Sequence, residues 1–162
     1  MLSDGNVKLV WAPTITNVSA PKVATELTVA GVLDLSCLVT AANYTLGNGE
    51  DATIDEPALC SMNASSLPGR TSYSASMQFF RWTTVPEDTA WTTFTAKNIP
   101  GYLVQRVGKP YATAFAVGDQ LQVYQVVTGT PNLQSPEANS AIRFSLTFFM
   151  QERVDERAVA VA

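Results

Sequence analysis

The chain has 162 residues, of which 46% are apolar and only 15% are charged, against roughly 25% charged in an ordinary soluble globular protein. This length favours a single domain, residues 1–162, with its own core, and a surface so poor in charge suggests burial in an assembly. The net charge of −4, with ten Lys and Arg scattered singly, argues against a protein that wraps nucleic acid through a basic patch.

The chain opens with a strand and a long connection. Apolar and other residues alternate over Asn6–Ala12, which predicts a strand. Residues 13–31 are rich in turn-forming residues and predict a long connection that ends in a short apolar stretch. A second strand is expected over Val39–Leu46, stopped by the turn signal at residues 47–49.

An acidic segment follows, and then the clearest alternation in the chain. Residues 47–56 predict a long acidic loop, with a strand around Ala58–Asn63 after it. In Arg70–Trp82 the apolar residues Tyr73, Ala75, Met77 and Phe79 occupy one face of a strand and polar residues occupy the other.

Residues 86–98 carry the signals of one short α-helix. Pro86 suits the first helical position, and two acidic residues follow it where the helix dipole favours negative charge. Lys97 is expected in the last turn, before Pro100 and Gly101 prevent continuation. Trp91 and Phe94 would share one face of this helix, and so short a helix needs them docked on a sheet to be stable.

The rest of the chain reads as strands, a loop and a C-terminal tail. Strands are expected over Gly101–Val107, Gln120–Thr128 and Ala141–Gln151, with a loop over 130–140 and a tail over 152–162. The predicted fold class is mainly β: a β-sandwich or barrel of seven or eight strands flanked by one short α-helix.

The sequence contains few side chains that could catalyse a reaction or bind a metal ion. The chain has no histidine, which removes the commonest general base and metal ligand, so we predict no catalytic residue, no metal site and no cofactor. Met1 to Asp4 lack the features of a signal peptide, and no apolar run is long enough to span a bilayer, so we expect synthesis in the cytosol and no membrane contact. In that compartment Cys37 and Cys60 are expected to be buried thiols rather than a disulfide.

Several segments form an ordered set along the chain: Ser19–Pro21, Ala24–Leu27 with Gly31 and Asp34-Leu35, Leu46-Gly47, Thr53–Cys60, Tyr73–Trp82, Glu87–Trp91 and Tyr102–Arg106. In this order they resemble the major tail tube proteins of long-tailed phages of actinobacteria, and the resemblance covers about residues 6–150. The resemblance implies a β-sandwich with one helix that forms hexameric rings stacked into a hollow tube, assembled in the host cytoplasm and carried in the virion. It also implies that strands of six neighbours join into one inner barrel, which conducts DNA without specific binding, and that tape-measure and tail-end proteins are partners.

Two groups of residues are expected to serve assembly. The long connections 13–31 and 47–56 are predicted to lie at subunit contacts, because long loops in compact domains are usually functional. The candidates are Pro21, Glu26, Leu27, Asn48, Glu50, Asp51, Asp55 and Glu56. Polar sides of strands whose other side is core are candidates for the lumen wall: Ser72, Ser74, Ser76, Gln78, Gln120, Gln122, Arg143, Ser145 and Thr147.

Other readings of the sequence remain open. A capsid decoration or spike-like β-protein shares the β-richness and the lack of catalytic groups. A secreted tube protein of a bacterial injection system is another alternative, and it is more closely related to tail tube proteins. The enzyme alternative is a glycan hydrolase that uses two carboxylates.

Overall fold

The computed structural model describes residues 4–55, 59–60 and 66–162, and its named strands pair into one antiparallel sheet. The strands are β1 (Val7–Ala12), β2 (Leu33–Asp34), β3 (Thr45–Asp55), β4 (Ser66–Phe80), β5 (Pro100–Val107), β6 (Gln120–Thr128), β7 (Asn132–Leu133) and β8 (Arg143–Val159). Their order is β2-β1-β5-β6-β8-β4-β3, and β7 pairs with the start of β8. A π-helical turn, η1 (Val23–Leu27), and a short helix, α1 (Thr89–Thr93), complete the fold. The predicted class, mainly β with eight strands and one short α-helix, is confirmed.

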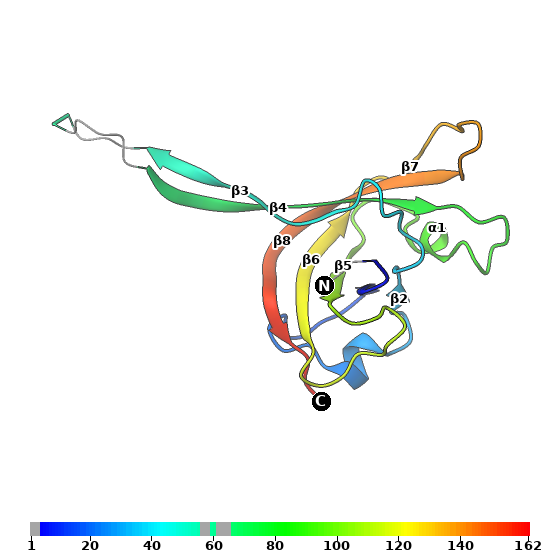
Figure 1. Cartoon of the computed structure of the whole chain (residues 1–162), viewed down its shortest axis with the longest axis horizontal. Coiled ribbons are helices and arrows are strands. Elements are labelled where there is room, and N and C mark those ends of the chain that lie inside the picture. Colours follow the sequence, from blue (N-terminus) through cyan, green and yellow to red (C-terminus); the bar gives the residue numbers. More distant parts are fainter. Residues whose placement is uncertain (1–3, 56–58, 61–65) are drawn as a thin grey trace.

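The sheet curls on itself (Figure 1). Trp11 on β1 and Phe148 on β8 have ring centroids 5.9 Å apart, although β5 and β6 lie between their strands in the sheet order. A glycine makes this approach possible, because a Cβ on Gly101 would lie 2.2 Å from the Trp11 ring. The inside of the curl holds the larger apolar cluster, which we call the concave core: Leu9, Trp11, Leu35, Ala75, Met77, Phe79, Ala90, Phe94, Leu103, Tyr124, Val126, Phe144, Leu146 and Phe148.

A second apolar cluster covers the opposite, convex face of the same strands. Val104 on β5 and Val123 on β6 point to this side, whereas Leu103 and Tyr124 point into the concave core. The cover consists of residues from the 13–31 segment and the loop after β5, with Ile15, Leu27 and Phe115 buried. Central strands are therefore buried on both faces, which hides the simple alternation that a half-exposed strand would show.

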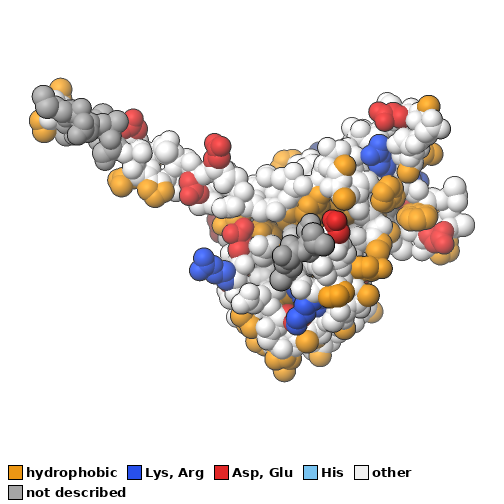
Figure 2. Space-filling view, viewed as in Figure 1, with side chains coloured by type: hydrophobic (Ala, Val, Ile, Leu, Met, Phe, Trp, Pro, Cys, Tyr) orange, Lys and Arg blue, Asp and Glu red, His pale blue; other side chains and the backbone are white. Residues whose placement is uncertain are grey.

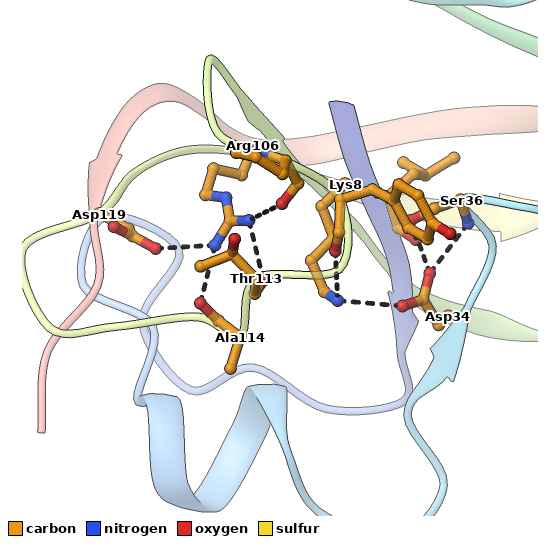
Figure 3. A network of polar contacts seen from close by, with 10 residues as sticks. Lys8, Asp34, Ser36, Arg106, Thr113, Ala114 and Asp119 are labelled. Atoms are coloured by element: carbon orange, nitrogen blue, oxygen red, sulfur yellow. Dashed lines mark hydrogen bonds and ion pairs between the residues drawn. The ribbon is translucent and has the colours of Figure 1, made fainter. Parts of the chain in front are cut away.

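Two carboxylates hold this cover on the sheet. Asp119 lies 3.0 Å from the Arg106 guanidinium, and both side chains are 2% exposed (Figure 3). Asp119 also accepts hydrogen bonds from the Ala116 N–H at 3.1 Å and from Lys109. Burial alone would raise the pKa of this carboxyl, but these three donors outweigh burial and hold its pKa below the usual value.

Glu26 is the second of these carboxylates, and it stabilises the 13–31 segment of the cover. Its carboxylate accepts the backbone N–H groups of Thr16 and Lys22, each at 2.8 Å, and the side chain is buried. Burial by itself raises the pKa of Glu26, yet the two N–H donors bring its pKa below the ordinary range. The carboxylate thereby binds the Glu26 side chain to Thr16, ten positions earlier in the cover.

We expect the free energy of unfolding to fall in acid. Groups whose pKa is lowered in the folded chain contribute stability above their unfolded pKa, about 4 for Asp and Glu, and lose it as the pH drops through the folded pKa. Urea unfolding should give a steady free energy from pH 7 to about pH 5 and a decline below about pH 4. The double variant Glu26→Gln, Asp119→Asn should be less stable at pH 7 and should show a flatter decline. A stability of the unaltered chain that is constant down to pH 3 would contradict this.

Several boundaries differ from the sequence predictions. Residues 39–44 are turns with one isolated bridge, and the strand expected there begins instead at Thr45 and continues through the predicted loop to Asp55. The predicted tail, residues 152–162, is a strand as far as Val159. The strand expected over Ala58–Asn63 lies largely outside the described residues. Both Cys37 and Cys60 are free and exposed, so the expectation of buried thiols is wrong.

The helix is shorter than predicted. Residues 86–88 precede it in a turn, in which the N–H groups of Glu87 and Asp88 bond to the Thr84 carbonyl at 3.0 and 3.1 Å. Lys97 lies outside the helix, because α1 ends at Thr93 and the chain there turns inward at Phe94. Threonine is a weak helix former, and four of the seven residues from 89 to 95 are threonines, at 89, 92, 93 and 95.

Candidate assembly surfaces

One exposed face of the sheet consists of hydroxyl and amide side chains. Cross-strand pairing places Thr45 opposite Ser76 and Ser76 opposite Thr147, with Gln78 opposite Ser145 in the next row. Directly opposed residues in antiparallel strands share a face. The face lies opposite the concave core, since the alternate residues of β4 are Ala75, Met77 and Phe79. We call it the hydroxyl–amide face: Thr45, Ser72, Ser74, Ser76, Gln78, Ser145 and Thr147.

Local contacts keep this face ordered without giving it charge. Gln134 donates to the Ser145 hydroxyl at 2.8 Å, and Ser72 donates to the Glu50 carbonyl at 3.0 Å. Arg143 lies at one end of β8, where it bonds to Ser140 at 2.9 Å. The seven side chains of the face itself are all neutral.

Gln120 and Gln122 do not belong to this face. Gln122 lies opposite Gln105 on β5, and on β6 it alternates in step with Tyr124 and Val126 of the concave core. It therefore lies on the other side of the sheet from Ser76 and Thr147. Gln120 and Gln122 thus do not share a face with the polar residues of β4 and β8 within the subunit, and their place in a lumen wall stays a prediction.

The second surface is an arm formed by the β3–β4 hairpin (Figure 1). We use the name arm for Asn48–Asp55 of β3 together with Ser66–Ser72 of β4. β4 leaves β8 after the pair Ala75–Phe148, and beyond that point the described part of β4 pairs only with β3. The hairpin thus projects from the body of the subunit.

Most of the interface candidates in the second predicted connection lie on the arm. Asn48, Glu50, Asp51 and Asp55 are exposed, and Figure 2 shows acidic side chains along the projection. Glu56 lies outside the described residues. The arm also exposes apolar side chains, because Ile54 and Leu67 form a cross-strand pair and are 47% and 63% exposed.

The candidates in the first connection lie inside the subunit. Pro21, Glu26 and Leu27 are buried, and the backbone around them is bound to the end of the chain through Val161. The N–H of Val23 bonds to the Val161 carbonyl, and the N–H of Val161 bonds to the Pro21 carbonyl, both at 2.9 Å. These three side chains cannot contact a neighbouring subunit without a rearrangement, since they serve to cover the convex face of their own sheet.

The two helix residues contact the concave core to different degrees. Phe94 is fully buried, with ring centroids 5.2 Å from Trp11 and 5.6 Å from Phe148. Trp91 is half-buried, and its ring lies 5.0 Å from Phe144 on one side and 4.1 Å from the Arg81 guanidinium. Arg81 is itself held by Asp88 at 2.8 Å.

The second half of β8 is a surface element that the side-chain pattern did not predict. From Phe149 to Ala158 this strand pairs with β6 on one side and no described strand lies on its other side, whereas the Val159 N–H bonds to the Ser19 carbonyl at 3.1 Å. Phe149, at the start of this open edge, is 59% exposed. Ala158 and Ala160 are both buried, and their spacing of two is the period of a strand. This pattern could have predicted that the strand continues, but alanines are too small to give a clear apolar alternation.

Sites for chemistry are not evident among the described residues. No group of three or more His, Cys, Asp or Glu that could hold a metal ion occurs there. No described helix is long and apolar enough to cross a membrane. A cleft of about 480 Å³ beside β1 is lined largely by apolar side chains, including Val7, Leu9 and Val39.

Comparison with known proteins points to one family. The family model described as phage tail tube protein matches residues 1–162. No curated protein sequence matches the chain significantly. Among solved structures, the fold is similar to a chain in the cryo-EM structure of the anti-feeding prophage baseplate, with a TM-score of 0.53 and 8% identity over 90% of this chain and 89% of that one.

Proposed function

This chain belongs to the phage tail tube protein family, and we propose that it assembles as hexameric rings that stack into a tail tube, the conduit for DNA delivery. Membership of this family makes it a structural virion protein. The order of motifs described above supports long-tailed phages of actinobacteria as its source. Its partners would be copies of itself, a tape-measure protein and tail-end proteins, and we assign it no catalytic residue or cofactor.

The observation that carries this proposal is the hydroxyl–amide face. It extends over three adjacent strands, and its seven side chains are neutral and exposed or half-buried, with Arg143 in line with them at one end of β8. DNA carries dense negative charge, and a basic wall would hold it through many phosphate contacts. A neutral polar wall instead offers weak contacts along which DNA can slide. We therefore assign Ser72, Ser74, Ser76, Gln78, Ser145 and Thr147 to the lumen wall.

Negative charge near this wall would come from the arm. Asp119 cannot supply it, because its side chain is buried against Arg106 and cannot face a channel. Glu50 and Asp51 are exposed beside the start of the hydroxyl–amide face, and Asp55 is exposed further along the arm, opposite Ser66. The predicted potential of the wall is thus neutral at the centre and negative towards the arm.

Electron microscopy of the purified protein tests the proposal. We expect six-fold rings and hollow tubes, with the hydroxyl–amide face towards the lumen in a reconstruction. Tubes with a continuous lining of lysine and arginine, or a chain that stays monomeric at high concentration, would contradict it. A chain that forms single rings but no tubes would favour a baseplate component, the alternative suggested by the likeness in fold to a baseplate structure.

A deletion variant tests the role of the arm, because it removes most of the arm and leaves the rest of the subunit in place. Replacing Glu50–Thr71 by an Asn-Gly turn joins Gly49 to Ser72, which already lie close together, since a Cβ on Gly49 would be 3.1 Å from the Ser72 hydroxyl. The concave core does not include the deleted residues, so the variant should keep the circular dichroism spectrum and thermal stability of a folded monomer. We expect it to form no tubes. Normal tubes from this variant would exclude the arm from assembly.

A further inference from the structure

Asn48 is the only asparagine of the chain that a glycine follows. Asparagine is a chemically labile residue, because its side-chain carbonyl carbon can be attacked by the backbone nitrogen of the next residue. A following glycine favours this attack, since it has no Cβ to obstruct the approach and its backbone is unusually free to rotate. The sequence therefore distinguishes Asn48-Gly49 from every other asparagine in the protein.

The structure leaves the carboxamide of Asn48 open to reaction. The side chain is exposed, and among the described residues it has no hydrogen-bond partner. Other exposed asparagines are engaged: Asn43 donates to Gln78 at 3.4 Å, and Asn17 accepts the Ser19 N–H at 3.1 Å. The side-chain carbonyl carbon of Asn48 is thus accessible both to the neighbouring backbone nitrogen and to water.

Strand pairing is interrupted at the same point. Asn48 lies opposite Tyr73 and Asp51 lies opposite Thr71, so two residues of β3 face the single residue Ser72. This is a β-bulge, in which the regular ladder is disrupted. Consistent with this, the carbonyl of Glu50 accepts a hydrogen bond from the Ser72 hydroxyl, a side-chain donor, at 3.0 Å.

The bulge matters because an extended strand does not present the reacting atoms to each other. The backbone at Asn48 must rotate before the Gly49 nitrogen can reach the side chain. Exposed and irregular segments open locally at little cost in free energy, whereas regular strands in a core do not. Both residues are exposed and lie at the edge of the sheet, so this rotation needs no disruption of the concave core.

The bulge also lies at the base of the arm. The last pair of β4 with β8 is Ala75–Phe148, and Ala75 also pairs with Leu46 of β3. The pair of Asn48 with Tyr73 comes two residues further out, where the Tyr73 ring still contacts Tyr124 of the body with centroids 6.3 Å apart. A change in the backbone at Asn48 would therefore act where the arm joins the body.

We propose that Asn48 deamidates spontaneously and that its isoaspartyl product loosens the arm from the body. The Gly49 nitrogen gives its proton to a solvent base and bonds to the side-chain carbonyl carbon of Asn48. The side-chain amide group leaves as ammonia, and a five-membered cyclic imide remains. Water then opens the imide at either carbonyl, which yields aspartate or isoaspartate. Water is the only co-reactant, and the inference does not depend on the proposed function.

The two products affect the arm differently. Both replace a neutral carboxamide by a carboxylate close to Glu50 and Asp51, so both add to the negative charge at the base of the arm. Isoaspartate also directs the main chain through the former side chain, which inserts one extra carbon into the backbone. An extra backbone atom breaks the spacing on which register depends. Isoaspartate should therefore disturb the pairing with Tyr73, whereas aspartate changes only the charge.

Peptide mapping by mass spectrometry tests the reaction on the full chain, incubated in mildly alkaline buffer. We expect Asn48 to be converted first, and faster at higher pH because attack requires loss of the amide proton. Asn98 and Asn139 are exposed as well but precede Ile and Ser, so they should remain largely unmodified. Preferential conversion at either of them, or none at Asn48, would overturn the inference.

A matched variant shows whether the imide is the route. Asn48→Gln keeps a neutral carboxamide but places it one methylene further from the Gly49 nitrogen, so the five-membered ring cannot form and conversion should be lost. Gly49→Ala should slow the reaction; it is made together with Ser72→Ala, because a Cβ on Gly49 would lie 3.1 Å from the Ser72 hydroxyl. Conversion of the unaltered chain at the same rate as Gly49→Ala/Ser72→Ala would contradict attack by this nitrogen.

Hydrogen exchange then tests the effect on the arm. The isoaspartyl fraction, separated by ion exchange, should exchange faster than the fresh chain over residues 45–55 and 66–74 and equally over the rest of the sheet. Asn48→Asp is the control, because it carries the same added charge on an unaltered backbone and should exchange like the fresh chain. Equal exchange of the arm in the isoaspartyl fraction and in Asn48→Asp would refute the loosening. These measurements need no assembled rings, so their failure would leave the proposed function untouched.

Discussion

Phe94→Ala is expected to lower the free energy of unfolding by about 3–5 kcal/mol, the usual cost of removing a large buried aromatic side chain. Phe94 is fully buried, and its ring contacts Trp11, Phe79 and Phe148, which come from three different strands. The change would leave a cavity between α1 and the concave core, at the point where the sheet closes on itself. Urea unfolding followed by tryptophan fluorescence or circular dichroism would measure the loss.

Trp91→Ala is the matched comparison, from the same helix. Trp91 is larger than Phe94 but only half-buried, and it keeps Phe144 and Arg81 as neighbours. Because less of its apolar surface is removed from water, its loss should cost clearly less than the loss of Phe94. Equal costs for the two variants, or a cost below about 1 kcal/mol for Phe94→Ala, would show that burial against the core is not what holds the helix.

Asp119→Ala is expected to destabilise the fold by about 3–5 kcal/mol, because it leaves the buried Arg106 guanidinium without its counter-charge. Arg106 would keep the carbonyls of Pro110, Thr113 and Ala114, at 2.9 to 3.0 Å. These carbonyl oxygens accept hydrogen bonds from the two terminal nitrogens of the guanidinium but do not neutralise its charge. The same change removes the acceptor of the Ala116 N–H, so the loop after β5 should also loosen.

The control for Asp119→Ala is a variant that breaks an exposed ion pair. Glu137→Gln removes the partner of Arg143, where the two groups are 3.9 Å apart and Glu137 is 74% exposed. Exposed pairs contribute about 0–1 kcal/mol, so this variant should unfold nearly as the unaltered chain does. Hydrogen exchange would locate the effect of Asp119→Ala, with faster exchange expected over the loop after β5 and the neighbouring convex cover. Unchanged exchange there would contradict the role given to the buried pair.

The elements that the sequence predicted well are those with one face in the core and one in water. In β4, Tyr73, Ala75, Met77 and Phe79 alternate with small polar residues because only one side of this strand is covered. The first part of β8 behaves in the same way, with Phe144, Leu146 and Phe148 inward. The position of the helix followed from Trp91 and Phe94, whose spacing of three places both on one side of a helix.

The arm shows why other elements could not be predicted. Beyond Leu46, which packs against the concave core, β3 has no apolar alternation, because neither of its faces is covered by the subunit. Its strand structure there depends on pairing with β4. Backbone hydrogen bonds to a partner strand leave little trace in side-chain pattern. Gly47 and Gly49 therefore suggested a turn, although both lie inside the strand. The residues after Gln151 were likewise missed, since their strand is formed by pairing with β6.

The sequence by itself determined the β class, the single short helix, the one-sided strands and the neutral polar face, because each depends on the local spacing of side chains. Only the tertiary structure decided which residues are free to meet another subunit. Folding of the 13–31 segment over the convex face buried Pro21, Glu26 and Leu27, and two-sided burial of β6 turned Gln122 away from the polar face. The departure of β4 from β8 created the arm and the open edge together. These outcomes depend on contacts between residues distant in the chain, which compete for the same surfaces and leave no periodic signal in the sequence.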